Sequence, residues 1–326
     1  DAKFVIAGDP FQIQPITLID HWKDMNIYSM VNLDRFVEPT TVPHEFEIVN
    51  LRKQYRAVPT IGNVFSHFTY NGILEHHRTS TEQKPLTISG FDFKDINIIK
   101  FPVAKFESIY KPNTLNGSKY QVYSALFTVE FAQSLAFQIQ SSHKDKFRIG
   151  IICPYKAQAT LIEKILAQQF EDTEKVEILI GTIHGFQGDE CDIIISIFNP
   201  PYSISKHPGM FLNKQNILNV SISRARDYLF IIMPDDNTQD IENLYKIKKI
   251  ERLIYRHAPN NHSVYESTQI EEIMFGSDTY IYDNSFATSH QSVNVYSKPE
   301  RKYEVRCEEV AVDVQIKRKH SVCHVL

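Results

Sequence analysis

The sequence has few cysteines and no long apolar run. Its 326 residues include four cysteines and one tryptophan, and the cysteines are scattered without a C-x-x-C pair. This argues against a disulfide framework or a zinc knuckle and favours a reducing intracellular compartment, such as the cytoplasm. No stretch approaches the roughly 18 apolar residues of a membrane span, so we expect no membrane among the partners.

An excess of charge of one sign is also missing. The formal net charge is −4, with 23% charged and 42% hydrophobic residues. These values exclude wholesale disorder and a polycationic chain. Any contact with nucleic acid must therefore come from a local basic surface. At roughly 100 to 200 residues per domain, the length predicts about two domains.

The chain starts without an initiator methionine or a leader segment. Asp1 is followed almost at once by the apolar run 4–7, which we interpret as a strand. This start predicts a fragment of a longer chain. An upstream segment could supply half of an active site.

Alternating apolar runs and helical patterns predict an α/β fold with a parallel sheet. The expected strands are residues 4–7, 96–101, 148–153, 176–181, 192–198 and 228–233, and the expected helices are 59–68, 124–141 and 156–170. Residues 102–119 predict an excursion with a turn at Asn116 and Gly117. After Arg256, residues 258–263 resemble a linker. Alternation in 280–282 and 310–316 predicts a small β-rich appendage.

Four polar segments carry candidate chemistry, and the first follows the expected strand 4–7. It runs Gly-Asp-Pro-Phe-Gln-Ile-Gln-Pro from Gly8. A turn at the carboxyl end of a strand would expose Asp9 and Gln12 in the ligand crevice of the sheet, where Gln12 could bond a phosphate oxygen. The alternative is an ordinary Gly-Asp-Pro turn.

The second segment, 51–59, precedes an expected helix. It places Tyr55 next to Arg56. A tyrosine could stack on a base, and an arginine can grip phosphate with two parallel hydrogen bonds. The alternative is a solvated helix entry with Pro59 in the first turn.

The third segment, 181–192, lies between two expected strands and contains three glycines. Glycine lets the backbone approach a ligand closely, and its amides can hold an anion. Glu190 could accept a hydrogen bond from a ribose hydroxyl. The alternatives are a hairpin loop for the glycines and, for His184, a surface or hydrogen-bonded structural histidine.

The fourth segment, 219–226, precedes the expected strand 228–233. It contains Arg224 and Arg226. Two arginines beside a strand suit a phosphate clamp that stabilises the charge developing in phosphoryl transfer. The alternative is a pair of solvated side chains.

In this order, the four segments resemble motifs III, IV, V and VI of superfamily one helicases, in the branch of the RNA helicase of nonsense-mediated decay. A Pro-Tyr-x-x-Gln element of the same family is present from Pro154 to Gln158. The agreement extends over residues 4–233. The resemblance implies two RecA-like domains with ATP and Mg²⁺ bound between them.

The resemblance also implies roles for individual residues. It implies that Gln12 and Arg56 sense the γ-phosphate and that Arg224 stabilises the transferring phosphoryl group. A second set would bind the nucleotide: Tyr55 at adenine, Gly188 near the phosphates, Glu190 at the ribose, and Arg226 as second choice for the catalytic arginine. A third set would line a groove for single-stranded DNA or RNA: Pro154, Tyr155, Gln158, Thr182 and His184.

Two family elements are missing from the sequence. It contains no Gly-x-x-x-x-Gly-Lys-Ser/Thr string and no acidic magnesium motif upstream of Gln12. Without the lysine and the metal that neutralise the triphosphate, this fragment alone should not hydrolyse ATP appreciably. Smaller departures are Ala57 and Val58, where relatives carry Met and His, and Asp189, where they often carry Arg.

The resemblance predicts a division of the chain into three parts. Residues 1–45 would be the tail of the first motor domain and its connection, 46–256 the second RecA-like domain, and 257–326 a linker with the β-rich extension. The predicted function is the carboxy-terminal half of an ATP-dependent helicase or translocase, with the missing amino-terminal motor domain as a partner. The alternative is a non-catalytic nucleic-acid-binding or scaffold module with a helicase-like fold.

Overall fold

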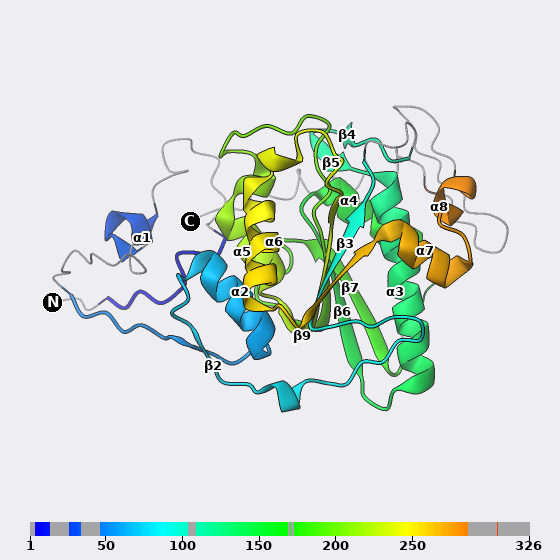
Figure 1. Cartoon of the computed structure of the whole chain (residues 1–326). Helices are drawn as coiled ribbons and strands as arrows, with labels where there is room; N and C mark the ends of the chain where they lie inside the picture. Colours follow the sequence, from blue (N-terminus) through cyan, green and yellow to red (C-terminus); the bar gives the residue numbers. More distant parts are fainter. Residues whose placement is uncertain are drawn as a thin grey trace.

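A parallel sheet forms the centre of the molecule (Figure 1). The computed structural model describes residues 4–13, 26–33, 46–103, 109–168, 170, 173–285 and 305. Within them, six strands pair in the order β10-β3-β9-β8-β6-β7, and every pair is parallel. The strands are β3 (Ile96–Phe101), β6 (Phe147–Cys153), β7 (Val176–Thr182), β8 (Cys191–Ile197), β9 (Ala225–Pro234) and β10 (His262–Glu266). The predicted α/β class is confirmed.

Helices cover both faces of this sheet (Figure 1). One face carries α2 (Pro59–Thr69), α5 (Gln215–Ile222) and α6 (Tyr245–His257), and the other carries α3 (Val122–Ser142), α4 (Lys156–Leu166) and α7 (Ser267–Phe275). The inner strands β3 and β8 are buried along their whole length, as their non-alternating apolar runs predict. In the described part of the chain, no helix is both long and apolar enough to cross a membrane.

Short elements complete the described structure. They are α1 (Ile27–Met30), α8 (Tyr280–Asp283), β1 (Lys53–Gln54), β2 (Glu75–His76), β4 (Asn113–Leu115), β5 (Ser118–Tyr120), and the 3₁₀ turns η3 (Ser80–Glu82), η4 (Phe211–Asn213) and η5 (Ile241–Asn243). β4 and β5 form an antiparallel hairpin around Asn116 and Gly117, whose φ angles are 48° and 80°. Two positive φ angles are typical of a tight hairpin turn, so the predicted turn is confirmed.

The strand predicted for residues 4–7 is wrong. These residues have no secondary structure, and Phe4 and Val5 are exposed. A strand needs a neighbour to pair its backbone groups, and within the described residues this segment pairs with no other strand. Apolar composition alone therefore misled the prediction.

Two predictions near the end of the described chain are also wrong. The segment 258–263 is not a linker, because β10 starts within it and pairs with β3 as an edge strand. Residues 280–282 belong to the helical turn α8, which buries Ile281. The β-rich appendage is thus not seen in the residues described up to 285, and the predicted strand 310–316 lies outside the described residues.

A buried carboxyl on α7 holds α8 in place. Glu271 accepts hydrogen bonds from the backbone N–H of Ile281 (2.8 Å) and the hydroxyl of Tyr123 (2.5 Å). Burial raises the pKa of Glu271 from 4.5 to about 7, against the opposing effect of these hydrogen bonds. The folded protein therefore keeps Glu271 protonated at pH values where the unfolded chain has lost that proton.

This difference predicts a pH dependence of stability. Because the folded state binds the extra proton, the free energy of unfolding falls as the pH rises from 4.5 to about 7. The expected fall is on the order of 3 kcal/mol. Urea unfolding at about pH 5 and about pH 8 measures it. Glu271→Gln should remove this part of the pH dependence and the exposed Glu272→Gln should not; equal profiles for both variants would contradict the assignment.

Candidate functional site

Three predicted site residues meet where β8 and β9 begin. Cys191 and Ala225 are paired in register, and the N–H of Cys191 donates to the carbonyl oxygen of Arg224 (3.2 Å). Glu190, Arg224 and Arg226 therefore lie together at the end of the sheet where these strands begin, which we call the amino edge; the opposite end is the carboxyl edge. Gln12 was predicted to follow the carboxyl end of a strand 4–7. It follows a segment without secondary structure instead, and it joins the residues at this amino edge through Arg224.

Arg56 reaches the same edge from the entry of α2. The N–H of Val58 donates to the carbonyl oxygen of Arg226 (2.9 Å). Glu190 then bridges two arginines, accepting from Arg56 Nε at 2.8 Å and from Arg226 Nη1 at 2.7 Å. Burial alone would raise the pKa of Glu190, but Arg56 and Arg226 outweigh it and lower this pKa. The carboxylate is thus held ionised between two cations.

Arg224 is the buried cation of the group. It is 4% exposed, and its Nη2 donates to Gln12 Oε1 at 2.5 Å. Burial, together with repulsion from Arg56, lowers the pKa of Arg224 to about 10. Its Nε atom is buried and has no hydrogen-bond partner in the described structure. A desolvated cation with an unused donor would gain from binding an anion.

A small network orients Gln12. Its Nε2 donates to Asp9 Oδ2 (3.2 Å), which also accepts from the hydroxyl of Tyr70 (2.6 Å). Asn219 Nδ2 donates in turn to the Tyr70 oxygen at 3.0 Å. Tyr70, at the end of α2, escaped the sequence analysis because no motif marks it. It links the segment around Gln12 to the helix that precedes Arg224.

Tyr55 and Gly188 lie on the exposed surface of the protein. Tyr55 is 62% exposed, and its ring centroid lies 4.4 Å from that of His77. Gly188 has φ +100°, which favours glycine, and a Cβ added there would meet no atom within 4 Å. The space above Gly188 is therefore open to a ligand.

A second group of predicted residues lies at the carboxyl edge. Cys153 and Thr182 are paired in register, and the N–H of Ile183 donates to the carbonyl oxygen of Cys153 (3.1 Å). This pairing brings Pro154 and Tyr155 close to Thr182 and His184. The two groups of site residues thus occupy opposite edges of one sheet.

Phe211 joins this second group and was missed by the sequence analysis. Its ring centroid lies 5.6 Å from that of Tyr155 and 6.1 Å from that of His184. Burial, with a smaller effect of Lys214, lowers the pKa of His184, which favours the neutral ring. Phe211 lies in a 3₁₀ turn without periodic pattern, so nothing in the sequence marks it. We call Tyr155, His184 and Phe211 the aromatic cluster.

Gln158 does not line a groove in this structure. It is fully buried, accepts from the backbone N–H of Gln121 (2.8 Å) and donates to Ser124 Oγ (3.1 Å). Both ends of its amide are thus used inside the protein. Gln158 fixes the start of α4 against α3. This arrangement does not support its expected contact with single-stranded nucleic acid.

The segment 183–190 links the two edges. It returns from the end of β7 to the start of β8 without a helix, and Phe186 packs on the sheet. A Cβ at Gly150 would lie 2.9 Å from Phe186, and one at Gly181 would lie 3.0 Å away. The two glycines therefore allow the ring to approach the strands closely.

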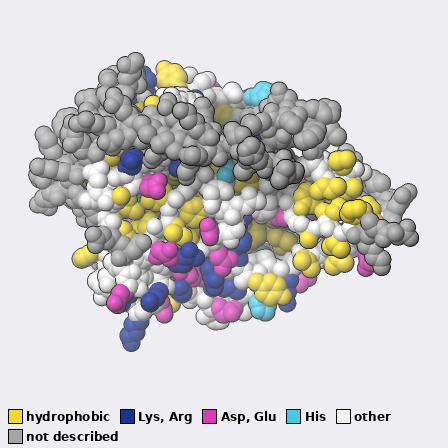
Figure 2. Space-filling view, turned by 180° about the vertical axis from the view of Figure 1, so that it is seen from behind, with side chains coloured by type: hydrophobic (Ala, Val, Ile, Leu, Met, Phe, Trp, Pro, Cys, Tyr) yellow, Lys and Arg dark blue, Asp and Glu magenta, His cyan; other side chains and the backbone are white. Residues whose placement is uncertain are grey.

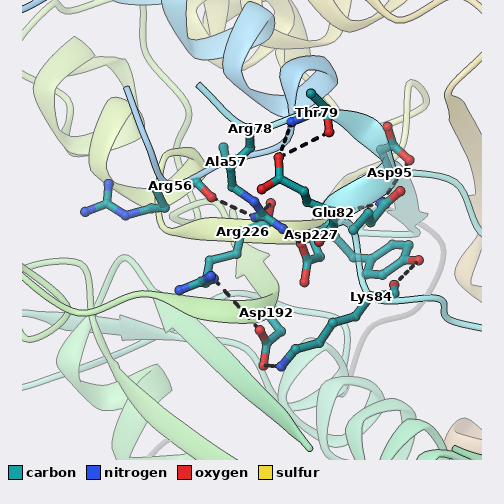
Figure 3. A network of polar contacts seen from close by, with 12 residues as sticks. Arg56, Ala57, Arg78, Thr79, Glu82, Lys84, Asp95, Asp192, Arg226 and Asp227 are labelled. Carbon is teal, nitrogen blue, oxygen red and sulfur yellow. Dashed lines mark hydrogen bonds and ion pairs between the residues drawn. The ribbon is translucent and has the colours of Figure 1, made fainter. Parts of the chain in front are cut away.

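Gln12, Arg56, Glu190, Arg224 and Arg226 together are called the amino-edge group. Arg78 holds part of the backbone of this group (Figure 3). Its Nη1 donates to the carbonyl oxygens of Arg56 (2.8 Å) and Arg226 (3.0 Å). Its Nη2 donates to Asp227 Oδ1 (2.6 Å) and to the carbonyl oxygen of Glu82 (2.8 Å). Arg78 and Asp227 are both buried. Sequence analysis missed this pair, because 149 residues separate the partners.

The described residues do not fit a metal by themselves. Among them, no three or more His, Cys, Asp or Glu side chains are grouped so as to hold an ion. The amino-edge group instead presents Arg56, Arg224 and Arg226, which suit an anion such as phosphate. Magnesium ligands upstream of Asp1 stay a prediction.

Comparison with known proteins shows the family. Residues 32–236 match the family described as AAA domain, and the chain belongs to this family. The matched range contains the predicted residues from Arg56 to Arg226. The resemblance to superfamily one helicases of the nonsense-mediated-decay branch is confirmed.

Similar curated proteins carry helicase names. DNA polymerase alpha-associated DNA helicase A of Saccharomyces cerevisiae is 28% identical over 74% of this chain and 36% of its own length. Probable helicase senataxin of Homo sapiens is 30% identical over 71% of this chain and 8% of its own. Regulator of nonsense transcripts 1 homolog of Arabidopsis thaliana is 25% identical over 71% and 17%. The chain thus spans about a third or less of the length of these relatives.

Proposed function

We propose that this chain is the second motor domain of an ATP-dependent helicase or translocase that acts on single-stranded nucleic acid. The buried Arg224 hydrogen-bonded to Gln12 is the observation that carries the proposal. A buried arginine with a free donor is suited to stabilise charge on a transferring phosphoryl group. Helicase names among the similar proteins support the same reading.

The amino-edge group would form one side of the nucleotide site. In this proposal Arg224 binds the transferring phosphoryl group, and Gln12 and Arg56 sense the γ-phosphate. Tyr55 stacks on adenine, Gly188 approaches the phosphates and Glu190 binds the ribose. Since Glu190 also bridges Arg56 and Arg226, a phosphate that binds these arginines would compete with the carboxylate for them.

The other side of the nucleotide site would come from an upstream motor domain. We assign residues 1–45 to its tail and connection and place the second domain from residue 46 onward. The upstream part would supply the phosphate-binding loop and the ligands of Mg²⁺. The natural reading frame before Asp1 tests this: a Gly-x-x-x-x-Gly-Lys-Ser/Thr string is expected there. Its absence would favour a non-catalytic binding or scaffold module.

The aromatic cluster at the carboxyl edge would stack on bases of the bound strand, next to Pro154 and Thr182. Aromatic stacking is worth about 1–3 kcal/mol per base and tolerates any sequence. Phe211→Ala is therefore expected to weaken binding of a single-stranded oligonucleotide by about 5- to 150-fold. Fluorescence anisotropy measures the affinity.

Phe137→Ala is the matched control for this variant. Phe137 is an aromatic on α3, 74% exposed, on the opposite face of the sheet from η4. Its removal should leave the affinity unchanged. Equal affinities of Phe211→Ala and Phe137→Ala would contradict the placement of the strand at this cluster.

A further inference from the structure

Helix α6 carries a row of basic side chains on its outer side. Its inner side packs Ile247, Ile250 and Ile254 into the core. Lys249, Arg252 and Arg256 follow at intervals of three and four residues, and such residues share one helix face. Together with Leu253 they line a hollow of about 400 Å³. We call these three cations the α6 stripe.

The two arginines of the α6 stripe lack acidic partners in the described structure. Elsewhere on the same helix, Lys248 pairs with Asp236 at 2.8 Å and also with Glu251. Arg252 and Arg256 are exposed, and no described carboxylate or carbonyl group binds their guanidinium groups. Their charge is therefore available to a ligand, on a chain whose net charge is −4.

The third cation of the stripe is fixed in place. Lys249 Nζ donates to the carbonyl oxygen of Phe68 (3.1 Å) and lies 5.2 Å from the centre of the Phe68 ring. Burial, and to a lesser degree Lys246, lowers the pKa of Lys249. At the end of the row, the rings of His67 and His257 stack at 3.7 Å. The hollow is thus lined by one hydrogen-bonded lysine and by two guanidinium groups that have no partner among the described residues.

The first turn of α6 is joined to the segment that carries Phe211. Asn213, in the same turn as Phe211, donates through Nδ2 to the carbonyl oxygen of Asn243 just before α6 (2.9 Å). Lys246 Nζ on α6 donates to Gln215 Oε1 (2.8 Å) at the start of α5. α6 lies on the side of the molecule facing the viewer in Figure 1. On the opposite side, Lys and Arg side chains are mixed with Asp and Glu (Figure 2).

We propose that the α6 stripe binds the phosphodiester backbone of a nucleic-acid strand beyond the aromatic cluster. Each free arginine can grip one phosphate, and such contacts are independent of sequence. The row from Lys249 to Arg256 spans about 10 Å, so it suits successive phosphates of one chain better than a single phosphate ion. The inference rests on the proposed function and extends the strand path along α6.

The test compares a short and a long oligonucleotide. The unaltered chain and Arg252→Gln/Arg256→Gln are titrated with single strands of about 8 and about 24 nucleotides across a range of salt concentrations. Loss of two phosphate contacts should lower the slope of log affinity against log salt by about 1.4 for the long strand. When the salt concentration falls from about 0.5 M to about 0.1 M, the affinity of the unaltered chain for the long strand should therefore rise roughly tenfold more than the affinity of the variant.

A charge-matched control separates specific contacts from net charge. Lys144→Gln/Lys146→Gln removes two exposed lysines after α3, and its slope should equal that of the unaltered chain. Equal slopes for all three proteins with retained binding would overturn the α6 stripe and leave the proposed function standing. If the slope falls equally with both oligonucleotides, the stripe belongs to the groove itself, which overturns a separate extension. Failure of the unaltered chain to bind either strand would overturn both proposals.

Discussion

Replacing Arg224 with alanine is expected to lower the rate of ATP hydrolysis by about 10³- to 10⁵-fold, the range known for arginines that stabilise phosphoryl transfer. The rate is measured on the longest natural chain that contains these residues. Arg224 is buried and hydrogen-bonded to Gln12, so its guanidinium group is held in place before the substrate binds. Substrate affinity should change much less than turnover, because the charge it stabilises develops in the transition state.

Arg226→Ala is the informative comparison. The Arg226 side chain is 41% exposed and paired with Glu190, so a smaller loss of rate is expected. Arg224→Lys keeps the charge but loses the planar fork and should not restore the rate. If Arg224→Ala keeps a high rate of ATP hydrolysis and Arg226→Ala has none, the assignment is contradicted and the role moves to Arg226. A similar melting temperature of both variants would show that folding is not the cause.

Replacing Arg78 with methionine is expected to reduce the free energy of unfolding by about 3–5 kcal/mol. Asp227 would remain buried without its partner, and the carbonyl oxygens of Arg56 and Arg226 would lose a shared donor. Burial already raises the pKa of Asp227 against the opposing effect of Arg78, so the carboxylate depends on this arginine. Urea unfolding measures the loss.

Two further variants make this prediction specific. The double change Arg78→Met/Asp227→Leu removes both charges and should recover much of the lost stability, since apolar replacements of a buried pair are often tolerated. Glu177→Ala breaks the ion pair of Glu177 with Arg148, in which both side chains are 45% exposed. This change should reduce the free energy of unfolding by less than about 1 kcal/mol. If Arg78→Met is as stable as Glu177→Ala, the buried pair does not hold this site.

The strands inside the sheet were predictable because burial on both faces requires continuous apolar runs. Residues 96–101, for example, form β3 with the predicted bounds. Strands at the side of the sheet and isolated segments were harder to predict. β10 is short and polar at several positions, and only pairing with β3 makes it a strand. Residues 4–7 have strand-like composition but pair with no other strand of the described chain, and residues 280–282 alternate like a strand but belong to α8. Pairing is a property of the whole chain and cannot be read from one segment.

The site was predictable only as far as its motifs extend. Arg56, Glu190 and Arg226 meet through direct contacts, although up to 170 residues of chain separate such positions. Arg78, Tyr70 and Phe211 escaped prediction because isolated side chains have no local pattern. Gln158 shows the converse: it belongs to a family element, yet both ends of its amide are hydrogen-bonded inside the protein. Motif membership therefore does not distinguish contact from support.

The most direct test of the central claim is the ATPase rate of the longest natural chain that contains these residues, with and without single-stranded DNA and RNA. We predict hydrolysis that rises strongly when one of these polymers is added, because the amino-edge group completes the nucleotide site and the aromatic cluster binds the strand. A chain that binds single strands but shows no turnover with either polymer would contradict the account.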